Sequence, residues 1–104
     1  MLSPSDLRKE IERRLRSYLS RDKSGIRKAL LRLLIRAKSM TVPQIHEALS
    51  TNFDVTYHSV ASMVGIVSSK LGILSTHKMK DGSLGVYELK AQYVDLVEQV
   101  VAST

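Results

Sequence analysis

The sequence predicts a mainly α-helical chain with one small β-hairpin. Apolar residues recur at helical spacing in five separate stretches, each with start or stop signals at its ends. The pair Asp81-Gly82, a preferred two-residue hairpin turn, separates two short runs at residues 73–80 and 83–89. A length of 104 residues fits a single domain, so these elements are expected to share one core.

The first predicted helix, within residues 1–23, is amphipathic. Ser3 is followed by proline, and Asp6 lies in the first turn, which is typical of a helix start. An apolar stripe runs along this helix at intervals of four residues, with Tyr18 on its flank. The stripe consists of Leu7, Ile11, Leu15 and Leu19. We expect either the C-terminal helix or a second copy of the protein to cover it.

The second predicted helix begins after Ser24, which is expected to be its N-cap. Its apolar residues cover a wide arc, as expected of the central helix of a small core. They are Ile26, Ala29, Leu30, Leu31, Leu33, Leu34, Ile35 and Ala37. Ser39 and Met40 are then expected to be extended and to lie against the hairpin.

Residues 41–49 are predicted to form a short third helix. Thr41 and Gln44 have the spacing of a capping box, and Pro43 lies in the first turn. Ile45 and Leu49 belong to its buried side, together with Ala48. Asn52 and Asp54 then indicate a turn.

Residues 56–71 are predicted to form the fourth helix, with Thr56 as its N-cap and Gly72 as its left-handed end. Gly65 in the middle of this helix is expected to allow the close approach of another helix. The expected core face consists of Val60, Val64, Val67 and Leu71.

A hairpin with Asp81-Gly82 as its loop would pair Leu74 with Leu89, Thr76 with Tyr87 and Lys80 with Ser83. The first two pairs are expected to face the core. The opposite face would carry Met79, His77, Leu84 and Val86. Residues 91–102 are predicted to be the last helix, with a stripe of Val94, Val97 and Val101 beside Leu96 and Val100.

Two short helices joined by a turn and followed by a hairpin have the outline of a winged helix-turn-helix. The predicted division is an amphipathic helix (1–23), a winged-helix core (24–89) and a C-terminal helix (90–104). Such a domain usually places its second helix in the DNA major groove.

Residues 40–74 resemble the helix-turn-helix of winged-helix transcriptional regulators, and are most similar to the ferric-uptake-regulator type. The matching pieces are Thr41-Val42-x-x-Ile45-x-x-x-Leu49 and Thr56-Tyr57-His58-Ser59-Val60. No arginine follows the tyrosine here, and no metal-binding second domain is present, so base specificity and metal response are not carried over. As a whole, the chain looks like a group of small archaeal winged-helix proteins of uncharacterised function.

The formal net charge of +6 is concentrated at one end of the sequence. Residues 1–38 hold 12 lysines and arginines against four acids, a net charge of +8, whereas residues 39–104 have a net charge of −2. A basic chain favours a polyanionic partner, here double-stranded DNA. The positive field would come mainly from the two N-terminal helices.

The candidate DNA-binding residues lie on the side of the fourth helix away from its valines and at the tip of the hairpin. Hydroxyl groups, imidazole and lysine can donate to base edges or phosphates. They are Thr56, Tyr57, His58, Ser59, Ser62, Ser69, Lys78 and Lys80. The same residues also fit an ordinary solvated helix face and an exposed strand.

The sequence predicts no enzyme, cofactor or metal site. Cysteine is absent, and the three histidines, His46, His58 and His77, fall on three different elements. There is no glycine-rich phosphate loop or nucleophile elbow. No apolar run approaches the roughly 20 residues of a membrane span, and the first ten residues lack the pattern of a signal peptide. We therefore expect a cytoplasmic protein with no membrane partner.

Two functions remain open. The first is a DNA-binding transcriptional regulator that acts as a homodimer, in which phosphate contacts dominate because the exposed side of the fourth helix has no arginine, asparagine or glutamine. The second is a non-enzymatic protein–protein interaction module on the same scaffold, which the acidic balance of residues 39–104 favours.

Overall fold

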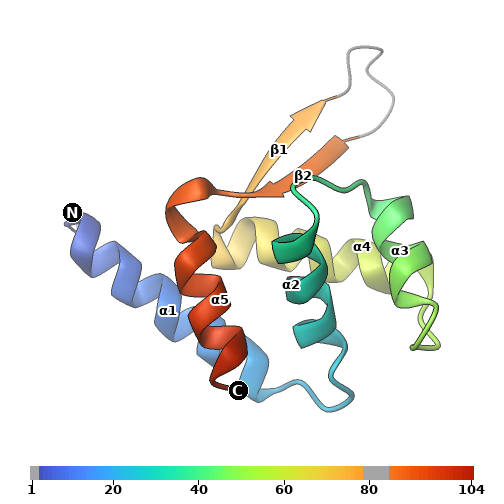
Figure 1. Ribbon diagram of the computed structural model, residues 1–104, viewed down its shortest axis with the longest axis horizontal. Coiled ribbons are helices and arrows are strands. Elements are labelled where there is room, and N and C mark those ends of the chain that lie inside the picture. Colours follow the sequence, from blue (N-terminus) through green and yellow to red (C-terminus); the bar gives the residue numbers. More distant parts are fainter. Residues whose placement is uncertain (1–2, 79–84) are drawn as a thin grey trace.

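The structure, a computed structural model that describes residues 3–78 and 85–104, confirms a mainly helical chain with a two-stranded hairpin (Figure 1). Its α-helices are α1 (Pro4–Ser20), α2 (Ile26–Arg36), α3 (Val42–Leu49), α4 (Tyr57–Ile66) and α5 (Val94–Ala102). A π-helical turn, η1 (Val67–Leu71), extends α4, and a 3₁₀ turn, η2 (Ala91–Tyr93), precedes α5. The antiparallel strands are β1 (Leu74–Lys78) and β2 (Gly85–Leu89).

Two predicted helix caps, Thr41 and Thr56, are confirmed, and the predicted helix start at residues 3–6 has a cap as well. The Ser3 hydroxyl oxygen accepts from the backbone N–H of Asp6 at the start of α1. Thr41 and Gln44 form a complete capping box, in which each side chain accepts from the backbone N–H of the other residue. Thr56 caps α4. Each cap satisfies an N–H that the helix itself leaves without a partner.

The prediction that Ser24 caps α2 is wrong. The N-cap residue is Gly25, which has a left-handed φ of 87° and no side chain to accept a hydrogen bond. The carboxylate of Asp22 does the capping instead, because it accepts from the backbone N–H groups of Gly25, Arg27 and Lys28 at 3.1, 3.2 and 3.1 Å. A negative charge at a helix N-terminus also interacts favourably with the helix dipole.

Helix α4 and η1 together span the predicted fourth helix and end at Gly72, which has a φ of 71°. The valine stripe faces the core as predicted, and Val60, Val64 and Val67 have no exposed surface. The prediction for Gly65 is wrong. Gly65 is exposed, and no atom lies within 4 Å of the position that a β-carbon would take. Other helices pack on the valine side, so nothing approaches Gly65.

The hairpin has the predicted register, with Leu74 paired to Leu89 and Thr76 to Tyr87. Met40 is extended and forms a bridge with Tyr87, also as predicted. Thr76, however, is exposed, because the hairpin projects from the helical body (Figure 1) and its contacts with the core are made by Leu74, Leu89 and Tyr87. The Asp81-Gly82 turn, the Lys80–Ser83 pair, Met79 and Leu84 lie outside the described residues.

The terminal helices α1 and α5 pack against each other within one chain. The guanidinium of Arg16 donates to the Ser103 hydroxyl at 3.0 Å, and that of Arg8 donates to the Gln92 carbonyl at 3.0 Å. Most of the α1 stripe is therefore buried, and Leu7 alone among its residues is exposed, at 39%. We predicted that either the C-terminal helix or a second copy of the protein packs on this stripe, and in the structure it is the C-terminal helix.

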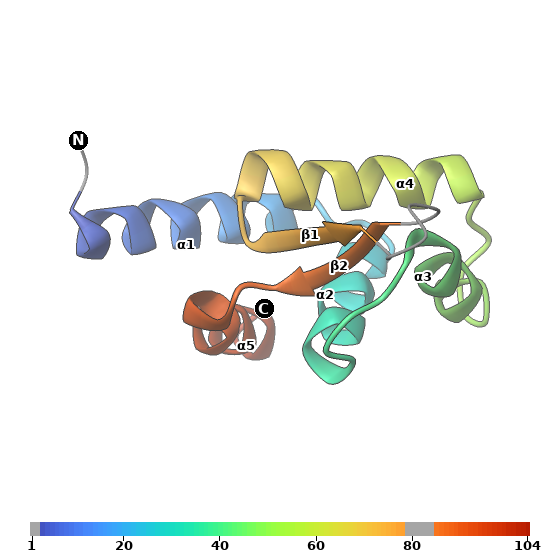
Figure 2. The same ribbon diagram turned by 90° about the horizontal axis from the view of Figure 1, so that it is seen from above.

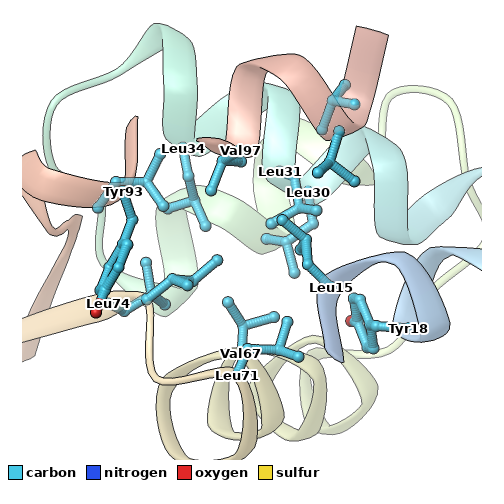
Figure 3. Packing of buried hydrophobic residues seen from close by; sticks show 14 of the residues in the cluster. Leu15, Tyr18, Leu30, Leu31, Leu34, Val67, Leu71, Leu74, Tyr93 and Val97 are labelled. Atoms are coloured by element: carbon cyan, nitrogen blue, oxygen red, sulfur yellow. The ribbon is translucent and has the colours of Figure 1, made fainter. Parts of the chain in front are cut away.

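All five α-helices, η1 and the hairpin contribute to the core, and Figure 3 shows the part where α1, α2, η1, the base of the hairpin and α5 meet. Tyr18, predicted to flank the α1 stripe, is itself buried there. In α5 the predicted stripe is buried except for Val94, which is half-buried, and Tyr93 joins it from η2. For function, the consequence is that α4 packs on the core through its valine side and exposes its other side to solvent.

Candidate nucleic-acid interface

Helix α4 lies along one broad face of the molecule, and α5 lies along the opposite face (Figure 2). The residues predicted to contact DNA from this helix are all exposed. They are Thr56, Tyr57, His58, Ser59, Ser62 and Ser69. His58, Ser62 and Ser69 share the side of the helix away from the valine stripe, as the helical spacing requires. Thr56 and Tyr57 precede Val60 by four and three residues, so they lie towards the valine side at the exposed N-terminal end of α4.

Tyr57 is positioned by the preceding helix. The Nε2 atom of His46 lies 3.0 Å from the Val55 carbonyl oxygen, which links α3 to the segment before α4. The rings of His46 and Tyr57 meet edge to face, with 5.9 Å between their centroids. Tyr57 still exposes 48% of its surface. Its ring is thus held in place and remains free to stack on a sugar or a base.

The hydroxyl groups on this side of α4 are not equivalent. Thr56 Oγ1 accepts from the Ser59 backbone N–H at 3.1 Å and donates to the Ser59 hydroxyl at 3.0 Å. Ser69 donates to the Gly65 carbonyl at 2.7 Å. These three side chains are engaged within the helix. Tyr57, His58 and Ser62 have no side-chain hydrogen bond to another described residue, so they are the best placed to bind a ligand.

The two lysines predicted to act from the hairpin cannot be placed relative to this face. Lys78 ends β1, where its backbone pairs with that of Gly85. Its side chain, and all of Lys80, lie outside the described residues.

A basic groove that sequence reasoning missed lies beside the C-terminal end of α4. We call it the arginine groove. It has a volume of about 360 Å³ and is lined by Arg13, Arg14, Ser17, Tyr18, Arg21, Arg27, Ile66, Lys70 and Leu71. It therefore combines five cations with no acid among its lining residues. Arg13 and Ser17 of α1 and its C-cap residue Arg21 recur at intervals of four, a spacing that is visible in the sequence. That this row lies beside Lys70 depends on the packing of α1 against η1.

Two contacts hold the walls of the arginine groove together. The guanidinium of Arg14 donates to the Lys70 carbonyl at 3.4 Å, which joins α1 to η1. Arg27 donates to the Tyr18 carbonyl at 2.8 Å, and its guanidinium carbon lies 4.5 Å from the centre of the Tyr18 ring. That distance is within the range of a cation–π interaction. Arg27 is therefore fixed, whereas Arg21 and Lys70 are exposed at the rim.

Tyr18 is the buried floor of the arginine groove, with 7% of its surface exposed. Its hydroxyl has no hydrogen-bond partner among the described residues. Burial raises the pKa of this phenol, Arg27 opposes that shift, and Asp22 adds to it. The phenol therefore stays protonated and neutral at physiological pH.

Glu10 binds two of the arginines at the end of the groove nearest the N-terminus. Arg13 and Arg14 both pair with its carboxylate. The hydrogen bond from Arg13 is the main cause that lowers the Glu10 pKa from 4.5 to about 2, against an opposing effect of desolvation. Glu10 thus stays ionised and partly neutralises Arg13 and Arg14. It does not pair with Arg21, Arg27 or Lys70.

A second groove, the α2–α3 groove, separates those two helices and has a volume of about 440 Å³. Its floor is apolar and its rim is basic. It is lined by Gly25, Lys28, Ala29, Arg32, Leu33, Arg36, Ala48, Leu49, Asn52 and Phe53. None of these residues belongs to α4, so this groove is separate from the α4 face.

Residues 3–78 and 85–104 contain no group of three or more histidine, cysteine or acidic side chains that could hold a metal ion. Within the same residues, no helix is both long and apolar enough to cross a membrane.

Residues 15–97 match the model of a family described as a protein of unknown function (DUF2551). The chain belongs to the DUF2551 family. It is also 44% identical over 93 residues to an uncharacterized protein of Archaeoglobus fulgidus, a match that covers 88% of this chain and 93% of that relative. No solved structure matches the chain.

The comparisons agree with the expectation of an uncharacterised archaeal protein. The DUF2551 match includes all of α4 and the hairpin, as well as Arg21, Arg27 and Lys70 of the arginine groove. The resemblance to ferric-uptake regulators and other winged-helix proteins is not tested by these comparisons and stays a prediction.

Proposed function

We propose that this DUF2551 protein is a DNA-binding winged-helix protein and a transcriptional regulator, with α3 and α4 as the helix-turn-helix and the hairpin as the wing. The observation that carries the proposal is the exposed α4 face, where Tyr57, His58 and Ser62 are available to a ligand. A positively charged groove borders its C-terminal end. Major-groove binding by the second helix is the usual function of this arrangement.

The proposed binding is dominated by phosphate contacts. Between Tyr57 and Leu71 there is no arginine, asparagine or glutamine, the residues that form the strongest bidentate contacts to bases. Hydroxyl groups and imidazole donate well to phosphate oxygens. We therefore expect weak sequence preference and a strong dependence on salt.

Fluorescence anisotropy with random duplex DNA at two salt concentrations tests the proposal. We expect micromolar-range binding at low salt that weakens strongly by about 200 mM, because log K falls with log salt by about 0.9 for each phosphate neutralised. A wild-type protein that binds no duplex at low salt would contradict DNA binding.

A matched pair of variants locates the binding face. Ser62→Glu places a negative charge in the middle of the α4 face, and Gln99→Glu adds the same charge to an exposed position on α5, on the opposite face (Figure 2). We expect Ser62→Glu to weaken DNA binding about tenfold or more through repulsion of phosphates. Gln99→Glu should have a much smaller effect. Equal losses of affinity in the two variants would exclude α4 as the contact.

The proposal includes a homodimer, which would present two copies of α4 to neighbouring half-sites. Leu7 is the residue of the α1 stripe that stays exposed and could contact a second copy of the protein. The apolar surface available to a dimer is therefore smaller than the sequence suggests. Light scattering at tens of micromolar separates the states. A mass near 11.6 kDa is that of a monomer.

The second candidate is a protein–protein interaction module, and the α2–α3 groove favours it. An apolar floor around Leu33, Leu49 and Phe53 with a rim of Lys28, Arg32 and Arg36 would suit an acidic amphipathic segment of a partner. The net charge of −2 over residues 39–104 also disfavours DNA as the partner of α4 alone. Absence of duplex binding at low salt would make this the leading function.

A further inference from the structure

We propose that the arginine groove is a second phosphate-binding surface, which extends the DNA footprint from α4 onto α1 and grips the DNA backbone. This inference rests on the proposed function and adds the residues that supply its affinity. The contact is independent of DNA sequence, because it is made to phosphates and not to bases.

The distribution of charge makes such a surface necessary. Helix α4 and η1 contain a single lysine, Lys70, and no arginine, and residues 39–104 as a whole are net negative. Non-specific DNA affinity comes essentially from cations that neutralise phosphates. The exposed α4 face alone therefore cannot supply it. The +8 charge of residues 1–38 can, provided that some of it lies beside α4.

The arginine groove meets that condition. Lys70 lines it together with four arginines, and the bond from Arg14 to the Lys70 carbonyl fixes α1 against the end of α4. Figures 1 and 2 both show α1 beside this end, away from α3. A helix rises 1.5 Å per residue, so Tyr57 and Lys70 are about 20 Å apart along the axis. The major groove is about 12 Å wide. If the N-terminal end of α4 lies in the DNA major groove, its C-terminal end therefore reaches the sugar-phosphate backbone beside that groove.

The chemistry of the groove suits a phosphodiester. Guanidinium groups bind phosphate oxygens through two parallel hydrogen bonds, and a preoriented guanidinium loses less entropy on binding. The Tyr18 ring orients Arg27. Arg21 and Lys70 are exposed and have no acidic partner within ion-pair distance among the described residues. They are consequently the two cations most available to DNA.

The α2–α3 groove provides a matched control. Arg32 and Arg36 are also exposed and also lack an acidic partner among the described residues, but they line the other groove. The double variants Arg21→Gln/Lys70→Gln and Arg32→Gln/Arg36→Gln each remove two positive charges. Any effect of net charge alone is therefore the same in both. All four positions are at the surface, and thermal unfolding by circular dichroism verifies that each variant is folded.

The experiment measures the affinity of the full chain for one duplex across a series of salt concentrations. We expect Arg21→Gln/Lys70→Gln to reduce the slope of log K against log salt by about 2, close to one unit for each phosphate that the variant no longer neutralises. At low salt its affinity should fall about tenfold or more. Arg32→Gln/Arg36→Gln should keep the wild-type slope.

Two results would overturn the inference in distinguishable ways. Equal slopes in the two double variants, with wild-type binding intact and Ser62→Glu defective, would leave DNA binding by α4 standing and exclude the arginine groove. No binding of any duplex by the wild-type protein would remove the proposed function, and the second phosphate surface with it.

Discussion

At the scale of single residues, Asp22 shows how one side chain can organise a helix start. Its carboxylate accepts from the backbone N–H of Gly25, the N-cap residue of α2, and from those of Arg27 and Lys28 in the first turn. We expect Asp22→Ala to lower the free energy of unfolding by about 1–2 kcal/mol, because those donors lose their partner. Urea denaturation measures the change. Lys23→Ala, an exposed neighbour in the same bend, is the control, and an equal effect of both variants would show that Asp22 does not cap α2.

Glu10 gives a prediction about pH. Its pKa of about 2 lies below the usual 4.5, so the contribution of its ion pairs to stability is fully present above about 4.5. That contribution is lost as the pH falls through about 2, and it is small because the pair is exposed. In an NMR titration of the carboxyl group, Arg13→Gln should raise the midpoint towards 4.5, although Arg14 remains. A midpoint that does not move would mean that Arg13 is not the main cause.

At the scale of elements, the two glycines of the fourth helix have opposite roles. Gly65→Ala should increase the free energy of unfolding by about 0.5–1 kcal/mol, because Gly65 is in a helix interior and its β-carbon would meet no atom. Gly72→Ala should be destabilising, because the φ of 71° is left-handed. Thermal unfolding of both variants provides the comparison. A destabilising Gly65→Ala would indicate a neighbour at the α4 face, such as a second copy.

The elements also show why part of the fold was predictable. The caps at Thr41 and Thr56 depend on side chains within three residues along the chain, and the valine stripe depends on helical spacing alone. The hairpin register followed from its turn. Ser24 was the wrong cap because the capping carboxylate comes from Asp22, in the loop between α1 and α2, where no helical periodicity applies. The prediction for Gly65 failed because its surroundings depend on which side of α4 the other helices occupy.

The candidate site was predictable to the same extent. The exposure of His58, Ser62 and Ser69 follows from the position of the valines, so these residues could be named from the sequence. The exposure of Tyr57 does not, because its spacing from Val60 puts it on the valine side. Which hydroxyl groups of the helix are engaged required the structure, because Ser69 bonds to Gly65 within the helix. The arginine groove could not be predicted, since it joins α1 to η1 across 56 positions of sequence, as in the contact between Arg14 and Lys70.

At the scale of the whole molecule, charge and shape together support the proposed DNA-binding side. The molecule measures 36 × 35 × 20 Å, and α4 and α5 lie on opposite broad faces (Figure 2). The net positive charge belongs to residues 1–38, and α1 brings part of it to the end of α4. A duplex placed against α4 would therefore also meet the rim of the arginine groove.

The most direct measurement is an NMR titration of the protein with a short DNA duplex, followed through the backbone amide signals. The central claim is that the α4 face binds DNA. It predicts the largest shift changes at residues 57–71, and the arginine groove predicts further changes around Arg21 at the end of α1. Amides of α5 should change little. No shift changes at low salt, or changes confined to α5 and the α2–α3 groove, would contradict the claim.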